Sequence, residues 1–122
     1  MNEKKIIVTI DGPAAAGKGS ISKAVANDLN FFYLETGLYY RILAKKFFIE
    51  GGDEKKIEQF MKLLVEKKFR FNFHDRQSLF NLKLSEISSI LAQNKAVRNY
   101  ILYEQRYAIE ALPKKYEGIL LE

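Results

Sequence analysis

The sequence predicts an α/β fold in which a parallel β-sheet is flanked by helices. Three short apolar runs have the length and composition of buried strands, namely Ile6–Ile10, Phe31–Leu34 and Gly118–Leu121. The segments between them carry apolar residues at helical spacing. Strands that alternate with helices indicate a parallel sheet, because parallel strands need a long crossover connection, which is usually a helix.

Composition and charge narrow the class of protein. The chain has 122 residues, of which 48% are hydrophobic and 29% charged, as expected for one globular domain. The absence of cysteine excludes disulfides, cysteine zinc sites and a thiol nucleophile, and fits a reducing compartment. The apolar run after the basic start is too short for a signal peptide, and no run approaches a membrane span. We therefore expect a soluble, cytoplasmic protein without a membrane partner.

The first helix is expected directly after the first strand. From Gly17 onward, Ile21, Val25 and Leu29 recur at helical spacing, and Asn30 is a plausible terminator. The first part of the chain is therefore predicted to form a strand, a loop, a helix and a second strand, in this order.

A second helix is predicted from Gly37 through Phe48, ended by Gly51 and Gly52. Asp53 can cap a third helix. The apolar stripe of this third helix consists of Ile57, Phe60, Met61, Leu64 and Val65.

The segment 69–84 alternates between apolar and polar residues. The apolar positions are Phe69, Phe71 and Phe73, and then Phe80, Leu82 and Leu84. Alternation on both sides of a polar turn predicts a β-hairpin, with His74 as a turn residue. We interpret it as a small acceptor-binding insert within a single domain that covers residues 1–122.

Two helices and a strand are predicted for the remainder. Ser85 can cap a short helix to about Gln93, and a longer helix with apolar residues near a 3.6-residue period ends before Pro113. The run that begins at Gly118 forms the last strand. Since the sequence stops at Glu122, directly after this strand, we expect a sheet that is incomplete at its C-terminal side.

The clearest motif is a glycine-rich loop between the first strand and the first helix. It has the pattern G-x-x-x-x-G-K of a phosphate-binding loop, and it is followed by a hydroxyl residue. Its residues are Gly12, Pro13, Ala14, Ala15, Ala16, Gly17, Lys18, Gly19 and Ser20. Glycines let successive backbone N–H groups point inward, and the helix N-terminus reinforces this nest for a triphosphate.

Lys18 is the predicted catalytic residue of this loop. Its ammonium group would lie on the outer phosphates and follow the charge that shifts during phosphoryl transfer. Gly19 stands where the strict pattern has Ser or Thr, so a direct bond from Ser20 to magnesium is not predicted, and no metal ligand is assigned. The alternative reading is a glycine-rich turn that only caps a helix.

Two motifs carry a resemblance to a known family. The run from Thr9 to Ser20 resembles the phosphate loop of bacterial cytidylate kinases, which are P-loop nucleoside monophosphate kinases. The run from Leu34 to Arg41 is similar to the stretch that lines the acceptor site in that family. The resemblance implies a P-loop-type sheet, with Thr36, Tyr40 and Arg41 as acceptor contacts. Without it, Arg41 reads as a surface salt bridge to Glu35 or Glu50, and Tyr40 as a core aromatic.

A third, looser match adds two further acceptor contacts. The helix pair around Ser88–Ala92 and Val97–Arg98 looks like the pair that closes over the acceptor in the family. The resemblance therefore implies that Ser89 and Arg98 contact the monophosphate. As an alternative, Arg98 is an ordinary solvated helix residue.

The resemblance implies transfer of the terminal phosphoryl group of ATP to CMP or dCMP, giving CDP or dCDP, with Mg²⁺ as cofactor. The lid arginines and adenine contacts of the family come later than residue 122, so we expect this chain to be a poor kinase by itself. The alternative is a non-catalytic nucleotide-binding fragment, or one half of a split kinase that needs a second chain. Nucleic-acid binding is not predicted, because the lysine pairs fit solvated faces and the tyrosines fit helix stripes.

Overall fold

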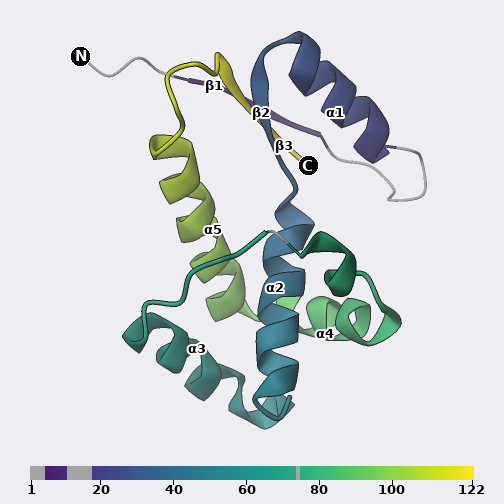
Figure 1. The fold of residues 1–122 in the computed structure, drawn as a ribbon. Helices are drawn as coiled ribbons and strands as arrows, with labels where there is room; N and C mark the ends of the chain where they lie inside the picture. The colour runs from purple at the N-terminus through teal and green to yellow at the C-terminus, as the bar shows by residue number, and fades with distance from the viewer. Residues whose placement is uncertain (1–4, 11–17, 74) are drawn as a thin grey trace. The chain divides into compact units, whose positions relative to one another are not determined.

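The computed structural model describes residues 5–10, 18–73 and 75–122, and for residues 18–20 the backbone alone (Figure 1). The chain divides into two compact units. We call residues 1–36 together with 106–122 the sheet unit, and residues 37–105 the helical unit.

The described residues of the sheet unit form three parallel strands, which are β1 (Ile6–Thr9), β2 (Phe31–Leu34) and β3 (Gly118–Leu121). Their order is β1-β3-β2, so β3 lies in the centre (Figure 1). Ile119 and Leu120 of β3 are fully buried. The predicted α/β class and parallel sheet are therefore confirmed, and a continuous apolar run marks the central strand, as expected for a strand covered on both faces.

The helix α1 (Lys18–Asp28) connects β1 to β2 and packs against β2 and β3. Its buried face consists of two small residues, Ser22 and Ala26. The apolar stripe that predicted the helix, Ile21, Val25 and Leu29, is exposed instead. The spacing thus identified the helix correctly, whereas the small side chains are the ones that let it approach the sheet.

Two local features shape the ends of the strands. Asn30 adopts a left-handed φ of 56°, and its side-chain Nδ2 donates to the carbonyl of Lys115 at 2.6 Å, so the predicted terminator is confirmed. Gly118 lies so close to β1 that a Cβ there would collide with the backbone carbonyl of Ile6. Only glycine fits this position of the central strand without a shift of its neighbour.

In the described part of the helical unit, the chain forms four helices and two short 3₁₀ turns. They are α2 (Thr36–Ile49), η2 (Glu54–Lys56), α3 (Ile57–Glu66), η3 (Arg76–Leu79), α4 (Leu82–Ala92) and α5 (Lys95–Glu110). Thr36, the first residue of α2, and residues 106–110 of α5 belong to the sheet unit. The core of the helical unit is formed by Leu38, Tyr39, Ile42, Leu43, Phe47, Phe60, Met61, Leu64, Leu84, Ile87, Leu91, Val97 and Ile101.

The boundary between α2 and α3 follows the predicted signals. Gly51 and Gly52 have φ values of 111° and 61°, and the amide of Gly52 donates to the carbonyl of Phe47 at 2.9 Å. This is the glycine-rich end of a helix that the sequence predicts. Asp53, however, caps η2 rather than α3, because its side chain accepts a hydrogen bond from the amide of Lys55. The N-cap of α3 is Lys56, which makes no side-chain cap hydrogen bond.

The hairpin predicted for residues 69–84 is wrong. The described residues of this segment form no strand, and the rings of Phe71 and Phe73 pack edge-on against Tyr39 of α2, at 4.8 and 5.2 Å between centroids. Phe71 also lies 6.1 Å from Tyr100 of α5. An extended chain places alternate side chains on one face, whatever that face meets. Here it meets helices rather than a second strand.

The second half of the predicted hairpin is part of α4. Asn81, not Ser85, caps this helix, because its Oδ1 accepts from the amide of Leu84 at 2.8 Å. Leu84, Ile87 and Leu91 are buried at helical spacing. The apolar residues at 80, 82 and 84 alternate just where the helical period of α4 begins. Three positions are too few to distinguish a strand from the start of a helix.

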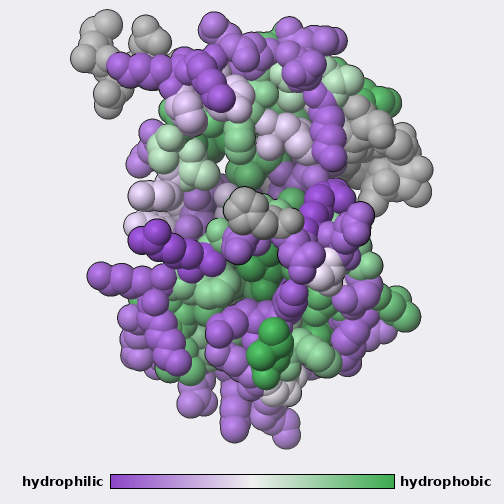
Figure 2. Space-filling view, viewed as in Figure 1, coloured by the Kyte–Doolittle hydropathy of each residue, from purple (hydrophilic) through white to green (hydrophobic). Residues whose placement is uncertain are grey.

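The surface is mostly hydrophilic in the view of Figure 2, with hydrophobic residues scattered among charged ones. Scattered apolar residues are normal on soluble domains. Within the described part of the chain, no helix is both long and apolar enough to cross a membrane.

Candidate functional site

The predicted phosphate loop connects two described elements of the sheet unit. β1 ends at Thr9, and α1 begins at Lys18, directly after the glycine-rich segment. The loop residues 12–17 lie outside the described residues, whereas Lys18, Gly19 and Ser20 form the first turn of α1. A parallel strand, a loop and a helix N-terminus thus follow each other in the order that an anion-binding loop requires.

A carboxylate lies at the carboxyl end of the sheet. The hydroxyl of Tyr33 in β2 donates to Oε1 of Glu122 at 2.9 Å, and the amide of Thr36 donates to the Glu122 carbonyl at 2.8 Å. Oε2 of Glu122 is buried and has no hydrogen-bond partner among the described residues. Ligand sites in open parallel sheets form at this end of the strands, so Glu122 and Thr36 occupy the expected place.

In the helical unit, Arg41 of α2 is the centre of the polar contacts. Its Nη1 donates to the carbonyl of Leu79 and to Oγ of Ser85, each at 3.0 Å. Its guanidinium carbon lies 4.4 Å from the centroid of the Phe80 ring. Arg41 is therefore held by neutral acceptors and an aromatic face. Glu50, one alternative partner, pairs with Lys46 at 3.0 Å instead.

Ser89 continues this line of polar groups along α4. Its Oγ donates to the carbonyl of Ser85 at 3.1 Å, and the Oγ of Ser85 is the group that accepts from Arg41. Residues four apart share one face of a helix. Ser89 is exposed, and its hydroxyl keeps lone pairs that can accept a hydrogen bond from a ligand.

Tyr40 and Arg98 form a second pair in the helical unit. Burial raises the pKa of the Tyr40 hydroxyl, and the positive charge of Arg98 partly offsets that rise, which places Arg98 of α5 within electrostatic reach of Tyr40. Nη1 of Arg98 donates to the carbonyls of Ala92 and Gln93 at 3.1 and 2.9 Å, where α4 ends. Arg98 is thus exposed but ordered, and it is not a freely solvated side chain.

Four of the five predicted acceptor residues therefore lie on α2, α4 and α5 of the helical unit, namely Tyr40, Arg41, Ser89 and Arg98. The fifth, Thr36, belongs to the sheet unit. Sequence reasoning missed Ser85, which it used as a helix cap, and Phe80, which it placed in the hairpin. The spacing of four residues between Ser85 and Ser89 is the signal that could have identified the polar face.

Among the described residues, no group of three or more His, Asp or Glu side chains is arranged to hold a metal ion.

The burial of Tyr39 leads to a testable prediction for alkaline pH. Burial raises the pKa of Tyr39 from 10.0 to about 12, and the Glu104 carboxylate adds to the rise. The folded state therefore keeps a proton that the unfolded state loses. Stability that is present below pH 10 is lost as the pH rises towards 12. We expect the free energy of unfolding to fall more steeply over this range in the wild type than in Tyr39→Phe, as measured by urea denaturation.

Tyr103→Phe is the matched control, because Tyr103 is 67% exposed on α5. This variant should follow the wild type over the same pH range. If Tyr39→Phe and Tyr103→Phe have the same pH dependence, the burial of the Tyr39 hydroxyl has no energetic consequence and the prediction fails.

Comparison with known proteins gives one family. The cytidylate kinase family model matches residues 8–118. A bifunctional pantoate ligase/cytidylate kinase of Prochlorococcus marinus is 36% identical over 117 residues, which are 85% of this chain and 23% of that protein. A cytidylate kinase of Bacillus thuringiensis is 30% identical over 120 residues, 88% of this chain and 53% of that kinase. One of Oceanobacillus iheyensis is 44% identical over 63 residues, 52% of this chain and 27% of that kinase. The chain thus spans about half the length of the Bacillus thuringiensis kinase.

Proposed function

Because this chain belongs to the cytidylate kinase family, we propose that it binds ATP and a cytidine monophosphate through a P-loop and an acceptor site. Phosphoryl transfer from ATP to CMP or dCMP, giving CDP or dCDP, is the reaction that these sites serve. The observation that carries the proposal is the segment Gly12–Ser20 between a parallel strand and a helix N-terminus.

The donor side of the reaction is assigned to the loop. Backbone N–H groups of residues 12–20 would hold the phosphates of ATP, and Lys18 would neutralise charge on the transferring group. No general base is required, because the attacking oxygen of a phosphate monoester is largely ionised near neutral pH.

Magnesium fits the carboxyl end of the sheet. Oε2 of Glu122 is a buried carboxylate oxygen without a partner among the described residues, and such an oxygen can accept a hydrogen bond from a water of hydrated Mg²⁺. When bound, Mg²⁺ neutralises charge on the β- and γ-phosphates of ATP. Glu122 would orient the hydrated ion, and the hydroxyl of Tyr33 holds the carboxylate in place.

The acceptor side is assigned to the helical unit, and Thr36 at the start of α2 stays a predicted contact. Arg41 is the phosphate ligand, since the guanidinium fork matches two phosphate oxygens. Arg98 and Ser89 supply donors and acceptors for the remainder of the nucleotide, and Tyr40 lies within electrostatic reach of Arg98. These assignments are supported by the contacts within the helical unit, which keep Arg41, Ser89 and Arg98 ordered.

A second candidate function is a nucleotide-binding half of a kinase that is completed by another chain. The edge strand β1 favours it, because Ile6 and Ile7 are 57% and 52% exposed. Among the described residues, β1 pairs with β3 alone. An open strand edge beside exposed apolar side chains can accept a further strand.

A coupled ADP-release assay with ATP, Mg²⁺ and CMP, run on the purified chain, tests the proposal. ADP release that depends on CMP supports the kinase reaction for this chain. Binding of both nucleotides without turnover supports the half-kinase alternative. A folded chain that binds neither ATP nor CMP, by isothermal titration calorimetry, would exclude both.

A further inference from the structure

A second arginine lies beside Arg41 in the helical unit. The guanidinium carbon of Arg41 lies 4.4 Å from the centroid of Phe80, and that of Arg76 lies 4.5 Å from the same centroid. The two carbons are therefore no more than about 9 Å apart, each within cation–π range of one ring. A phosphate that accepts hydrogen bonds from two guanidinium groups lies about 4 Å from each carbon, so two carbons on the same side of the ring and within about 8 Å of each other can share one phosphate.

Charge favours an anion at this place. Both guanidinium groups are always protonated, and although the ring attracts each of them, they repel one another. An anion between them offsets this repulsion. Arg76 is exposed and Phe80 is 45% exposed, so the pair is accessible from solvent.

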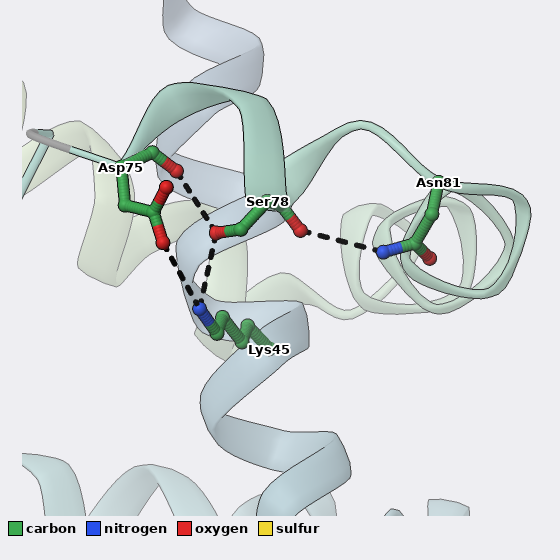
Figure 3. Close-up of polar contacts among 4 residues, drawn as sticks. All are labelled: Lys45, Asp75, Ser78 and Asn81. Carbon is green, nitrogen blue, oxygen red and sulfur yellow. Dashed lines mark hydrogen bonds and ion pairs between the residues drawn. The ribbon is translucent and has the colours of Figure 1, made fainter.

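The turn that carries Arg76 is held in place by other contacts, which Figure 3 shows. Nζ of Lys45 donates to Oγ of Ser78 at 3.1 Å and lies 3.9 Å from Oδ2 of Asp75. Oγ of Ser78 donates to the carbonyl of Asp75 at 2.9 Å, and Nδ2 of Asn81 donates to the carbonyl of Ser78 at 3.4 Å. Lys45 thus partly offsets the negative charge next to Arg76. The contacts of Lys45 therefore hold η3 against α2 without a ligand.

Arg41 retains donors for a ligand. Both of its hydrogen bonds come from Nη1, and no acceptor among the described residues meets Nη2 or Nε. The contacts with Leu79 and Ser85 therefore orient the guanidinium without using its whole fork. The same turn that positions Arg41 through Leu79 also carries Arg76 and precedes Phe80.

We propose that Arg76 binds the phosphate of the acceptor nucleotide together with Arg41, while the Phe80 ring holds both guanidinium groups by cation–π contacts. The identity of the nucleotide as CMP or dCMP rests on the function proposed above. The shared phosphate site itself rests on the geometry of Arg41, Phe80 and Arg76.

The test compares binding of CMP and of cytidine to the wild type, Arg76→Ala and Arg76→Lys by titration calorimetry. We expect Arg76→Ala to weaken CMP binding about tenfold or more, the usual loss for a hydrogen bond to a charged group. Arg76→Lys should lie between the two. Cytidine binding should stay within twofold of the wild type, because cytidine has no phosphate, whereas a merely structural role of Arg76 would weaken both ligands.

Arg70→Ala is the matched control, because Arg70 is an exposed arginine in the same unit. It should bind CMP within twofold of the wild type. Unchanged CMP binding in Arg76→Ala, or equal losses for CMP and cytidine, would overturn the inference.

A separate arm uses inorganic phosphate and the side-chain Nε–Hε signals of arginine in ¹H–¹⁵N spectra. Phosphate should shift the signals of Arg41 and Arg76 together in the wild type, and that of Arg41 less in Arg76→Ala. If CMP and cytidine do not bind but phosphate has this effect, the proposed function fails and the two-arginine site stands. If phosphate does not shift the Arg76 signal, the site is absent.

Discussion

Replacement of Lys18 by alanine is expected to reduce CMP-dependent ADP release by at least about 100-fold, the scale seen when one charge-stabilising donor is removed from an active site. The loss falls on the transition state, because the ammonium group follows charge that moves toward the leaving phosphate. Stability should change far less. A lysine in the first turn opposes the helix dipole, and alanine is a good helix former.

The control for this prediction is Lys114→Ala, because Lys114 is an exposed lysine of the same unit. Its turnover should remain within about twofold of the wild type, since surface substitutions away from a site have small effects. If Lys18→Ala and Lys114→Ala retain equal turnover, the glycine-rich segment is only a helix-capping turn. ATP affinity measured beside turnover separates loss of binding from loss of rate.

The second large effect concerns the core of the helical unit. Leu91 of α4 has no exposed surface, and its replacement by alanine leaves a cavity. We expect Leu91→Ala to lower the free energy of unfolding by about 2–5 kcal/mol, the range of buried leucine truncations. Urea denaturation followed by circular dichroism measures this loss.

Leu82→Ala provides the matched comparison on the same helix, because Leu82 is 78% exposed. Its effect should be within about 0.5 kcal/mol of zero. Equal effects at the two positions would mean that α4 does not bury the face formed by Leu84, Ile87 and Leu91. The hairpin reading of this segment makes the opposite prediction, since it places Leu82 and Leu84 on the same face of a strand.

The segment from Phe69 to Leu84 shows where sequence reasoning failed. Alternate rings at 69, 71 and 73 fit a strand, but alternation describes only an extended backbone. Whether such a backbone becomes part of a sheet depends on a partner strand, and Phe71 has Tyr39 and Tyr100 as neighbours instead. Partners from distant parts of the chain are not visible in a local pattern.

Arg41 shows the same difference, within the candidate site, between what a local pattern predicts and what contacts with distant residues decide. Its place in a motif predicted an acceptor role, which stays a prediction. The motif carried no information on how the side chain is held. The carbonyl of Leu79, the hydroxyl of Ser85 and the ring of Phe80 come from residues 38 to 44 positions away. Arg76 contacts the same Phe80 ring only because the turn η3 brings it there.

The sequence by itself determined the three parallel strands, most helices and their glycine and asparagine ends, because these depend on local periodicity and backbone sterics. It also indicated the family, which the family comparison confirms, and it predicted a phosphate-binding loop at residues 12–20, because phosphate binding requires glycine and lysine at fixed spacing. Tertiary structure alone decided which face of α1 is buried, where α4 begins, and that two guanidinium groups meet at Phe80. These features depend on contacts between distant residues, and such contacts form only when the chain is folded.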